Sequence, residues 1–271
     1  MPEAGLVEKP EVLENMPRLG LNDGFAFRCD PGKDCFGRCC HDVSIMLTPY
    51  DVLRMKKALG IDSSTFIEKY TSVMYSTEKQ LPVVFLKMEP DSLKCPFLSA
   101  EGCTTYAHRP WACRMYPLGM AEPTAPEAAA RRFYFVIKEE LCHGHEGAQE
   151  CSVRDFLAGQ GVESYDASQT SFRALLGTAA EAKEALTKEQ SAMYFMALYD
   201  LDRFRRFVFE TRFLQLFEVD ETRVEAIRKD DEELLDLAVD WLAYSLFHQR
   251  RMKLNKSAAQ RAACRTEAAP A

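Results

Sequence analysis

The sequence lacks the features that place a protein in or across a membrane. It contains no run of about eighteen consecutive apolar residues, so no transmembrane helix is expected. The first ten residues lack the basic n-region and the apolar h-region of a signal peptide. We therefore expect a cytoplasmic protein without membrane contacts, in which residues 1–24 form an extended N-terminal lead.

Motifs of several common functional classes are also missing. The sequence has no serine-hydrolase elbow, no P-loop and no dinucleotide-binding fingerprint. Its net charge of -7, which metal-bound thiolates would make more negative, argues against binding of nucleic acid through overall electrostatic attraction. No internal repeat is present. With 271 residues the chain is long enough to bury a core without the help of disulfides.

Cysteine is the residue type that the sequence has in abundance. Nine of its 10 cysteines lie between residues 29 and 151, and only Cys264 is remote. Disulfides rarely persist in the cytoplasm, so clustered cysteines there are more often metal ligands or catalytic thiols. We interpret Cys151, on a predicted short helix, and Cys264 as incidental.

The remaining eight thiols are the candidate metal ligands: Cys29, Cys35, Cys39, Cys40, Cys95, Cys103, Cys113 and Cys142. Zinc and a [4Fe–4S] cluster each take four thiolates, so eight suffice for two sites or for one site with spares. The spacings match neither zinc fingers nor ferredoxins, which weakly favours iron–sulfur over Zn²⁺ because paired zinc knuckles are missing. Some of these cysteines could instead be small buried hydrophobic residues.

Cys39 and Cys40 are adjacent in the sequence, and this affects how the eight thiols can be divided between metal sites. Neighbouring side chains in an extended segment point in opposite directions, so the two are expected to serve different sites. The cluster at residues 29–40 is therefore predicted to be half of a centre, or of two centres, that the later cysteines complete.

Basic residues beside the cysteines are candidates for the surroundings of the metal. Arg38, Arg109 and Arg114 could offset the negative charge of a thiolate site and donate hydrogen bonds to sulfur, or they could be ordinary surface arginines. Because thiols are in excess, the histidines nearby are expected to support the site and not to bind the metal; they are His41, His108, His143 and His145.

Local signals predict short elements around the cysteines. Thr48, Pro49 and Asp51 are typical of a helix start, and Gly60 of its end. A second helix is expected from Asp62 or Ser63, and strands at residues 43–47, 81–88 and 132–138. Residues 94–119 have no periodicity apart from one short helix within 107–115, so a metal would have to hold them.

Further along the chain the pattern is helical. Apolar residues at intervals of three to five residues predict one long helix over 195–217, and a second apolar stripe predicts a helix over 234–245. The predicted fold is α+β: a loop-rich cysteine-cluster domain with short strands and helices at 25–147, a mainly helical region at 148–255 and a flexible tail at 256–271. The C-terminal helices could bind a protein partner.

An ordered series of motifs resembles the YkgJ-like cysteine-cluster family over roughly residues 25–145. The family opening is usually a tighter Cys-x2-Cys-x2-Cys-Cys, whereas this sequence has Cys-x5-Cys-x3-Cys-Cys. The matching residues are Phe27, Cys29, Cys35, Cys39, Cys40, Leu47, Thr48, Pro49, Asp51, Cys95, Pro96, Phe97, Leu98, Gly102, Cys103, Tyr106, Arg109, Pro110, Cys113, Arg114, Tyr116, Pro117, Leu118 and Gly119.

The resemblance implies a zinc- or iron-chelating domain. A relative in this family, the flagellin lysine N-methylase, shares the cysteine cluster and is associated with an iron–sulfur centre. An iron–sulfur enzyme, either lysine N-methylase-like or redox, is therefore a second hypothesis, although the sequence shows no second cofactor motif. A structural zinc protein that acts as an interaction module is the third.

Overall fold

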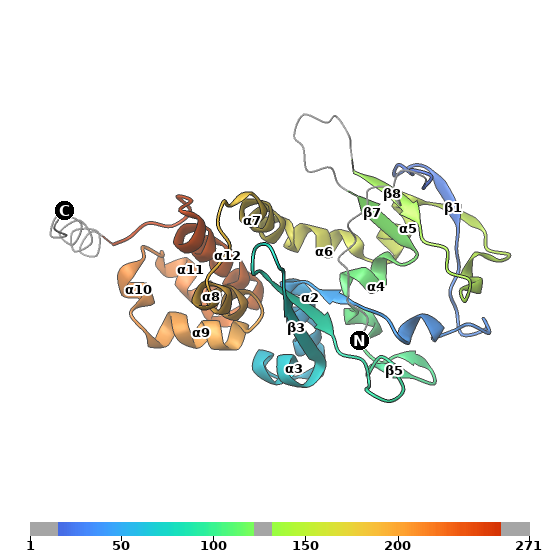
Figure 1. Cartoon of the computed structure of the whole chain (residues 1–271), viewed down its shortest axis with the longest axis horizontal. Helices are drawn as coiled ribbons and strands as arrows, with labels where there is room; N and C mark the ends of the chain where they lie inside the picture. Colours follow the sequence, from blue (N-terminus) through green and yellow to red (C-terminus); the bar gives the residue numbers. More distant parts are fainter. Residues whose placement is uncertain (1–15, 122–131, 256–271) are drawn as a thin grey trace.

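A computed structural model describes residues 16–121 and 132–255, and the predicted tail at 256–271 lies outside these residues. The fold is α+β, as predicted. Short antiparallel strands form small sheets in the cysteine-rich part, and helices make up the C-terminal part (Figure 1). The proposed division at residues 147 and 148 stays a prediction.

The two helices predicted after the first cysteines are present. Helix α2 (Pro49–Leu59) begins with a capping box between Thr48 and Asp51 and ends at Gly60, whose φ of 64° suits glycine. Helix α3 (Ser63–Tyr70) is capped by Asp62, whose side chain accepts a hydrogen bond from the Thr65 N–H. These starts and stops are local, which explains why the sequence predicted them.

A three-stranded sheet packs beside these helices in the order β2-β4-β3. Its strands are β2 (Met46–Leu47), β3 (Thr71–Tyr75) and β4 (Pro82–Leu86). Leu47 and Val84 face each other across the ladder and are almost fully buried, so one face of the sheet contributes to the core. The strand predicted within 81–88 is confirmed.

Three two-stranded ladders hold the rest of the cysteine-rich part. They pair β1 (Gly24–Ala26) with β9 (Glu150–Ser152), β5 (Leu98–Ser99) with β6 (Gly102–Cys103), and β7 (Leu118–Ala121) with β8 (Phe133–Val136). Cys151 pairs with Phe25 in the first ladder, so its placement on a helix was wrong. The short 3₁₀ helices are η1 (Arg38–Cys40), η2 (Tyr106–His108) and η3 (His143–His145).

The helix predicted over 195–217 is three helices. The chain leaves helical geometry at Asp200, whose carboxylate accepts a hydrogen bond of 2.6 Å from the Ser63 hydroxyl, and again at Thr211. Apolar spacing continues across both breaks, which is why the pattern did not show them. The three segments are α8 (Lys188–Leu198), α9 (Leu201–Glu210) and α10 (Phe213–Leu216).

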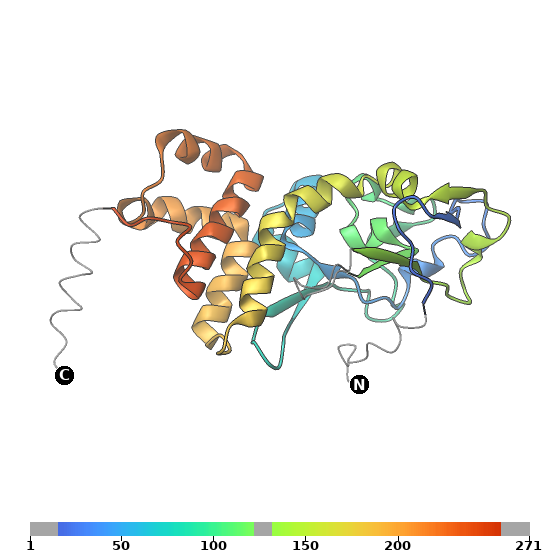
Figure 2. The same cartoon turned by 90° about the horizontal axis from the view of Figure 1, so that it is seen from above.

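Helix α12 (Asp231–Phe247) is the centre of the C-terminal part and confirms the predicted second helix. Leu234, Ala238 and Leu242 on it are fully buried. It contacts α2, α7, α8, α9 and α11, and Figure 2 shows it beside α7 and α8. The helices not yet named are α4 (Trp111–Met115), α5 (Val153–Gly159), α6 (Val162–Ser168), α7 (Thr170–Glu181) and α11 (Glu221–Lys229).

Charged groups join α2 to the C-terminal helices. The ammonium of Lys56, almost fully buried, lies 2.9 Å from Asp202 and 3.0 Å from Asp231. Apolar residues of α2 and α3 share one hydrophobic core with those of α8, α9 and α12. The molecule is elongated, with the cysteine-rich ladders at one end and α9 to α12 at the other (Figure 1). No helix in 16–121 or 132–255 is long and apolar enough to span a membrane.

Candidate metal centre

Four thiols form an inner group made of Cys40, Cys95, Cys103 and Cys113. The backbones of the first two meet directly, because the Cys95 N–H donates to the Cys40 carbonyl at 2.8 Å. Burial, together with the negative charges of Cys95 and Cys103, raises the pKa of Cys113 to about 12. Thiolates that disfavour one another's charge in this way are close in space, and a cation among them would relieve the repulsion.

The elements that carry the inner thiols converge from separate parts of the chain. Cys40 ends η1, Cys103 lies on β6, and Cys113 lies in the middle of α4. Gly102 precedes Cys103 with a φ of 111°, and a Cβ there would lie 3.0 Å from the Phe36 ring. Glycine therefore allows the β5–β6 hairpin to turn against the first cysteine loop.

A buried carboxylate fixes the helix that bears Cys113. Asp51 is fully buried; one of its oxygens accepts from the Thr48 N–H and hydroxyl, and the other accepts from the Trp111 N–H at 2.8 Å. Burial raises the pKa of Asp51 to about 6, although these hydrogen bonds oppose the shift. The Leu-Thr-Pro-x-Asp motif thus caps α2 and holds the first turn of α4.

The other four candidate thiols form an outer group made of Cys29, Cys35, Cys39 and Cys142. Although Cys29 is exposed at the surface, its partial desolvation and the charges of Cys39, Cys35 and Cys142 together raise its pKa to about 11. Cys35 is buried and accepts a hydrogen bond from the His143 N–H at 3.3 Å. This contact joins the first cysteine loop to a segment more than a hundred residues later.

The adjacent pair links the two groups. Cys39 and Cys40 lie on a 3₁₀ turn, so the extended backbone assumed for them was wrong. A hydrogen bond from the Cys40 thiol lowers the pKa of Cys39 to about 7, and the same bond raises the pKa of Cys40. The charges that further raise the pKa of Cys40 are those of Cys39, Cys95 and Cys113, and the charge of Cys39 also acts on Cys29.

The three arginines differ in what they contact. Arg38 is exposed, and its charge adds to the hydrogen bond with His143 that lowers the pKa of Asp34 beside the outer group. Arg109 is buried, donates to the Tyr106 carbonyl at 2.7 Å and lies near enough to Cys113 for its charge to lower the pKa of that thiol. Arg114 donates to backbone carbonyls, including that of Ala107 at 2.6 Å.

No hydrogen bond from Arg109 or Arg114 to sulfur is present among the described residues. Arg114 also donates to the Gln160 carbonyl at 2.6 Å and to the Tyr165 hydroxyl at 3.2 Å. Its guanidinium therefore supports the loop before α4 and the junction of α5 with α6. The role of the three arginines beside a bound metal stays a prediction.

One histidine stands apart from the other three. The Nδ1 of His143 and the Asp34 carboxylate form a hydrogen bond of 2.7 Å. Asp34, Cys35 and His143 also place one donor atom each within 4.8 Å of the other two. Within residues 16–121 and 132–255 they are the one such set of three His, Cys, Asp or Glu side chains. The ring of His41 contacts the Gly37 carbonyl, that of His108 the Arg54 guanidinium, and that of His145 the Ala26 carbonyl. Sequence reasoning missed Asp34, although it directly precedes a candidate ligand.

The donor chemistry of both groups fits a thiophilic metal or cluster. Three thiolates on one zinc ion, bonded at about 2.3 Å, would lie roughly 3.8 Å apart. In the described part of the chain no three of the eight thiols all lie within 4.8 Å of one another. A cluster binds its thiolates through different iron atoms and therefore holds them farther apart than a single zinc ion does.

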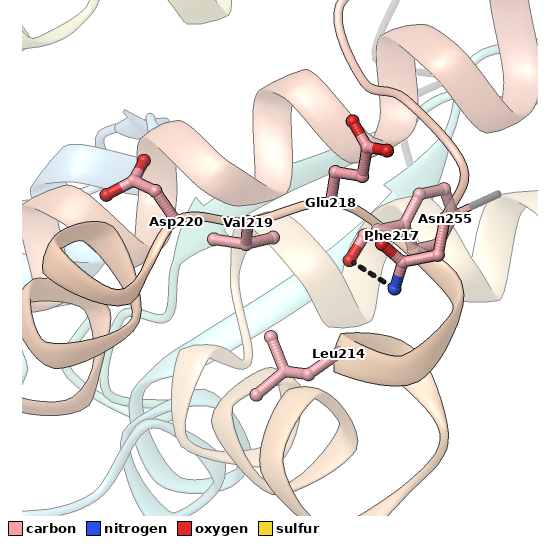
Figure 3. A pocket seen from close by; sticks show the side chains of 6 residues that line it. All are labelled: Leu214, Phe217, Glu218, Val219, Asp220 and Asn255. Atoms are coloured by element: carbon pink, nitrogen blue, oxygen red, sulfur yellow. Dashed lines mark hydrogen bonds between the residues drawn. The ribbon is translucent and has the colours of Figure 1, made fainter.

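Two surface hollows beside α10 contain none of the candidate ligands. The one drawn in Figure 3 has a volume of about 510 Å³ and is lined by α10, the segment that follows it and Asn255. Asn255 donates to the Phe217 carbonyl there at 3.4 Å, and no cysteine or histidine is among the lining residues. It is therefore not the metal site.

Comparison with known proteins supports a chelating domain at the cysteines. Residues 28–146 match the model of the CxxCxxCC family, which is described as a putative zinc- or iron-chelating domain. The resemblance found in the sequence is thereby confirmed. The matched range contains all eight candidate ligands and ends before Cys151. Neither the curated proteins nor the solved structures gave a match.

Proposed function

We propose that this chain binds metal at two centres, one in the inner group and one in the outer group of thiols. The observation that carries the proposal is the convergence of distant cysteine segments at two places: the Cys95 N–H donates to the Cys40 carbonyl at 2.8 Å, and the His143 N–H donates to the Cys35 sulfur at 3.3 Å. The inner group contains the four donors that a thiolate site needs. Cys151 has no thiol among the groups that shift its pKa, so it is left out.

For the inner group we propose an iron–sulfur cluster, with a single zinc ion as the alternative. The wider thiol spacing and the lack of zinc-knuckle spacing support the cluster. Such a cluster supplies one-electron chemistry when it is bound. Cys40, Cys95, Cys103 and Cys113 would hold it, and the buried Arg109 would offset part of its negative charge.

We place the protein in the cytoplasm. All nine described cysteines are free thiols, and thiol-rich sites without disulfides are typical of a reducing compartment. Such a compartment keeps the thiols available as ligands.

Metal analysis with a visible spectrum tests the choice of cofactor. We expect protein purified anaerobically to contain iron and acid-labile sulfide and to be brown. A colourless preparation with stoichiometric zinc would refute the iron–sulfur version while leaving the thiolate centres in place. Protein reconstituted anaerobically that holds neither metal would refute the proposed function as a whole.

A further inference from the structure

One set of donors in the outer group combines three ligand chemistries. Asp34 supplies a carboxylate oxygen, Cys35 a sulfur and His143 an imidazole nitrogen, and the three atoms lie within 4.8 Å of one another. Cys35 is buried, whereas the side chains of Asp34 and His143 are 73% and 34% exposed. The set therefore has a buried sulfur donor on one side and is accessible to solvent on the other.

The two loops that bring these donors together are fastened by contacts that involve none of the three donor atoms. Lys33 donates from its ammonium to the Glu146 carbonyl at 2.8 Å, and the Arg28 N–H donates to the Gly144 carbonyl at 2.8 Å. A Cβ at Gly144 would lie 2.4 Å from the Phe27 ring, so the loops approach closely only because this residue is glycine. The donor set is thus largely preformed.

We propose that Asp34, Cys35 and His143 bind one divalent transition-metal ion at the surface end of the outer group. The inference rests on the proposed function and makes the outer centre different in kind from the inner one. A mixed oxygen, nitrogen and sulfur set suits ions of intermediate softness such as Zn²⁺, Fe²⁺ or Co²⁺, whereas Mg²⁺ and Ca²⁺ prefer oxygen ligands. Three protein ligands leave one position of a tetrahedral ion open to solvent.

A metal ion bound by Asp34, Cys35 and His143 would exchange readily with solvent. The inner group offers thiolates only and suits a tightly held group, whereas the outer set offers one thiolate and two exposed donors. An ion there would displace the proton shared between His143 Nδ1 and Asp34 Oδ1 and the proton of the Cys35 thiol. The remaining thiols of the outer group lie around the ion without being required as ligands.

Cobalt binding to the full chain tests this site. After anaerobic purification and mild chelation, Co²⁺ is added and bound Co²⁺ is counted by equilibrium dialysis, while the metal or cluster of the inner group is counted in the same sample. We expect one Co²⁺ with a tetrahedral absorption spectrum in the wild type. His143→Ala should bind it about 100-fold more weakly, and Asp34→Asn about 10-fold more weakly.

The matched control is His41→Ala. His41 follows Cys40 as His143 follows Cys142, but its ring contacts only the Gly37 carbonyl, so Co²⁺ binding should equal that of the wild type. Retention of the inner metal by the variants shows that they are folded. Equal Co²⁺ affinity in wild type, His143→Ala and Asp34→Asn, or no Co²⁺ bound to the wild type, would overturn the inference while an intact inner centre leaves the proposed function standing.

Discussion

At the scale of single residues, the glycine before η1 controls where the adjacent cysteines point. Gly37 has a φ of 80°, and a Cβ there would lie 3.4 Å from a methyl group of Leu98. The turn it opens carries Cys39 toward the outer group and Cys40 toward the inner group. A side chain at this position would strain the backbone at the point where both groups meet.

The variant Gly37→Ala should therefore weaken metal binding. We expect a loss of about 1–2 kcal/mol for a non-glycine residue at this φ, which corresponds to roughly 5- to 30-fold weaker retention against a chelator. Gly60→Ala is the control, because Gly60 also has a positive φ, of 64°, but a Cβ at this position would meet no atom within 4 Å. It should lower the free energy of unfolding by a similar amount and leave metal retention unchanged; equal metal loss in both variants would contradict the account.

At the scale of elements, the attachment of α2 to the C-terminal helices keeps the metal-binding part in place. Asp202 is the group to alter: burial raises its pKa, but hydrogen bonds from Lys56 and the Ser63 N–H outweigh burial, and the net pKa is lowered. A lowered pKa means that the ionised carboxylate stabilises the fold above its unfolded pKa and that this contribution disappears as the pH falls.

Asp202→Asn should reduce the free energy of unfolding by roughly 1–3 kcal/mol at pH 7, because the buried ammonium of Lys56 loses one of its two anionic partners. The difference from wild type should shrink as the pH falls below about 4 and through the lowered pKa of the folded carboxyl, below which the wild-type carboxyl is also neutral. Urea unfolding at several pH values measures it. The control is Glu225→Gln, which removes an exposed ion pair with Lys229 and should change the free energy of unfolding little. If the free energy of unfolding of Asp202→Asn differed from that of the wild type by the same amount at every pH, the prediction would be wrong.

Elements differ in how far the sequence predicts them, and the reason is the distance of the partners. Helix α2 was predicted almost to the residue because Thr48, Asp51 and Gly60 act on their own neighbours. The break at Asp200 depends on Ser63, and the strand at Cys151 depends on Phe25. The periodicity of apolar residues in the sequence carries no information about partners that lie more than a hundred residues away in the chain.

The candidate site shows the same limit. The separation of Cys39 from Cys40 was predicted, but from an extended backbone that is a 3₁₀ turn in the structure. Asp34 was missed, and His143 was predicted only to support the site, because their proximity depends on how two distant loops meet. The proposed grouping of the thiols likewise depends on contacts between distant segments, such as the hydrogen bond from the Cys95 N–H to the Cys40 carbonyl.

At the scale of the whole molecule, the cysteine-rich ladders and helices α9 to α12 lie at opposite ends (Figure 1), while Cys95 and Cys103 pack against the shared core. The aromatic residues of the predicted stripe pack inward, with the Phe204 and Trp241 rings 5.5 Å apart, so the stripe belongs largely to the core. A protein partner on these helices stays a prediction. The metal centres are the part of the molecule from which its function is inferred.

The central claim is that Cys40, with Cys95, Cys103 and Cys113, forms a centre that excludes the adjacent Cys39. Thiol alkylation of the metal-loaded protein, located by mass spectrometry, tests it in Cys39→Ser, Cys40→Ser and the control Cys151→Ser. Cys40→Ser should expose the other three inner thiols to the reagent, whereas Cys39→Ser and Cys151→Ser should leave them protected. Equal loss of protection at the inner thiols in Cys39→Ser and Cys40→Ser would contradict the account.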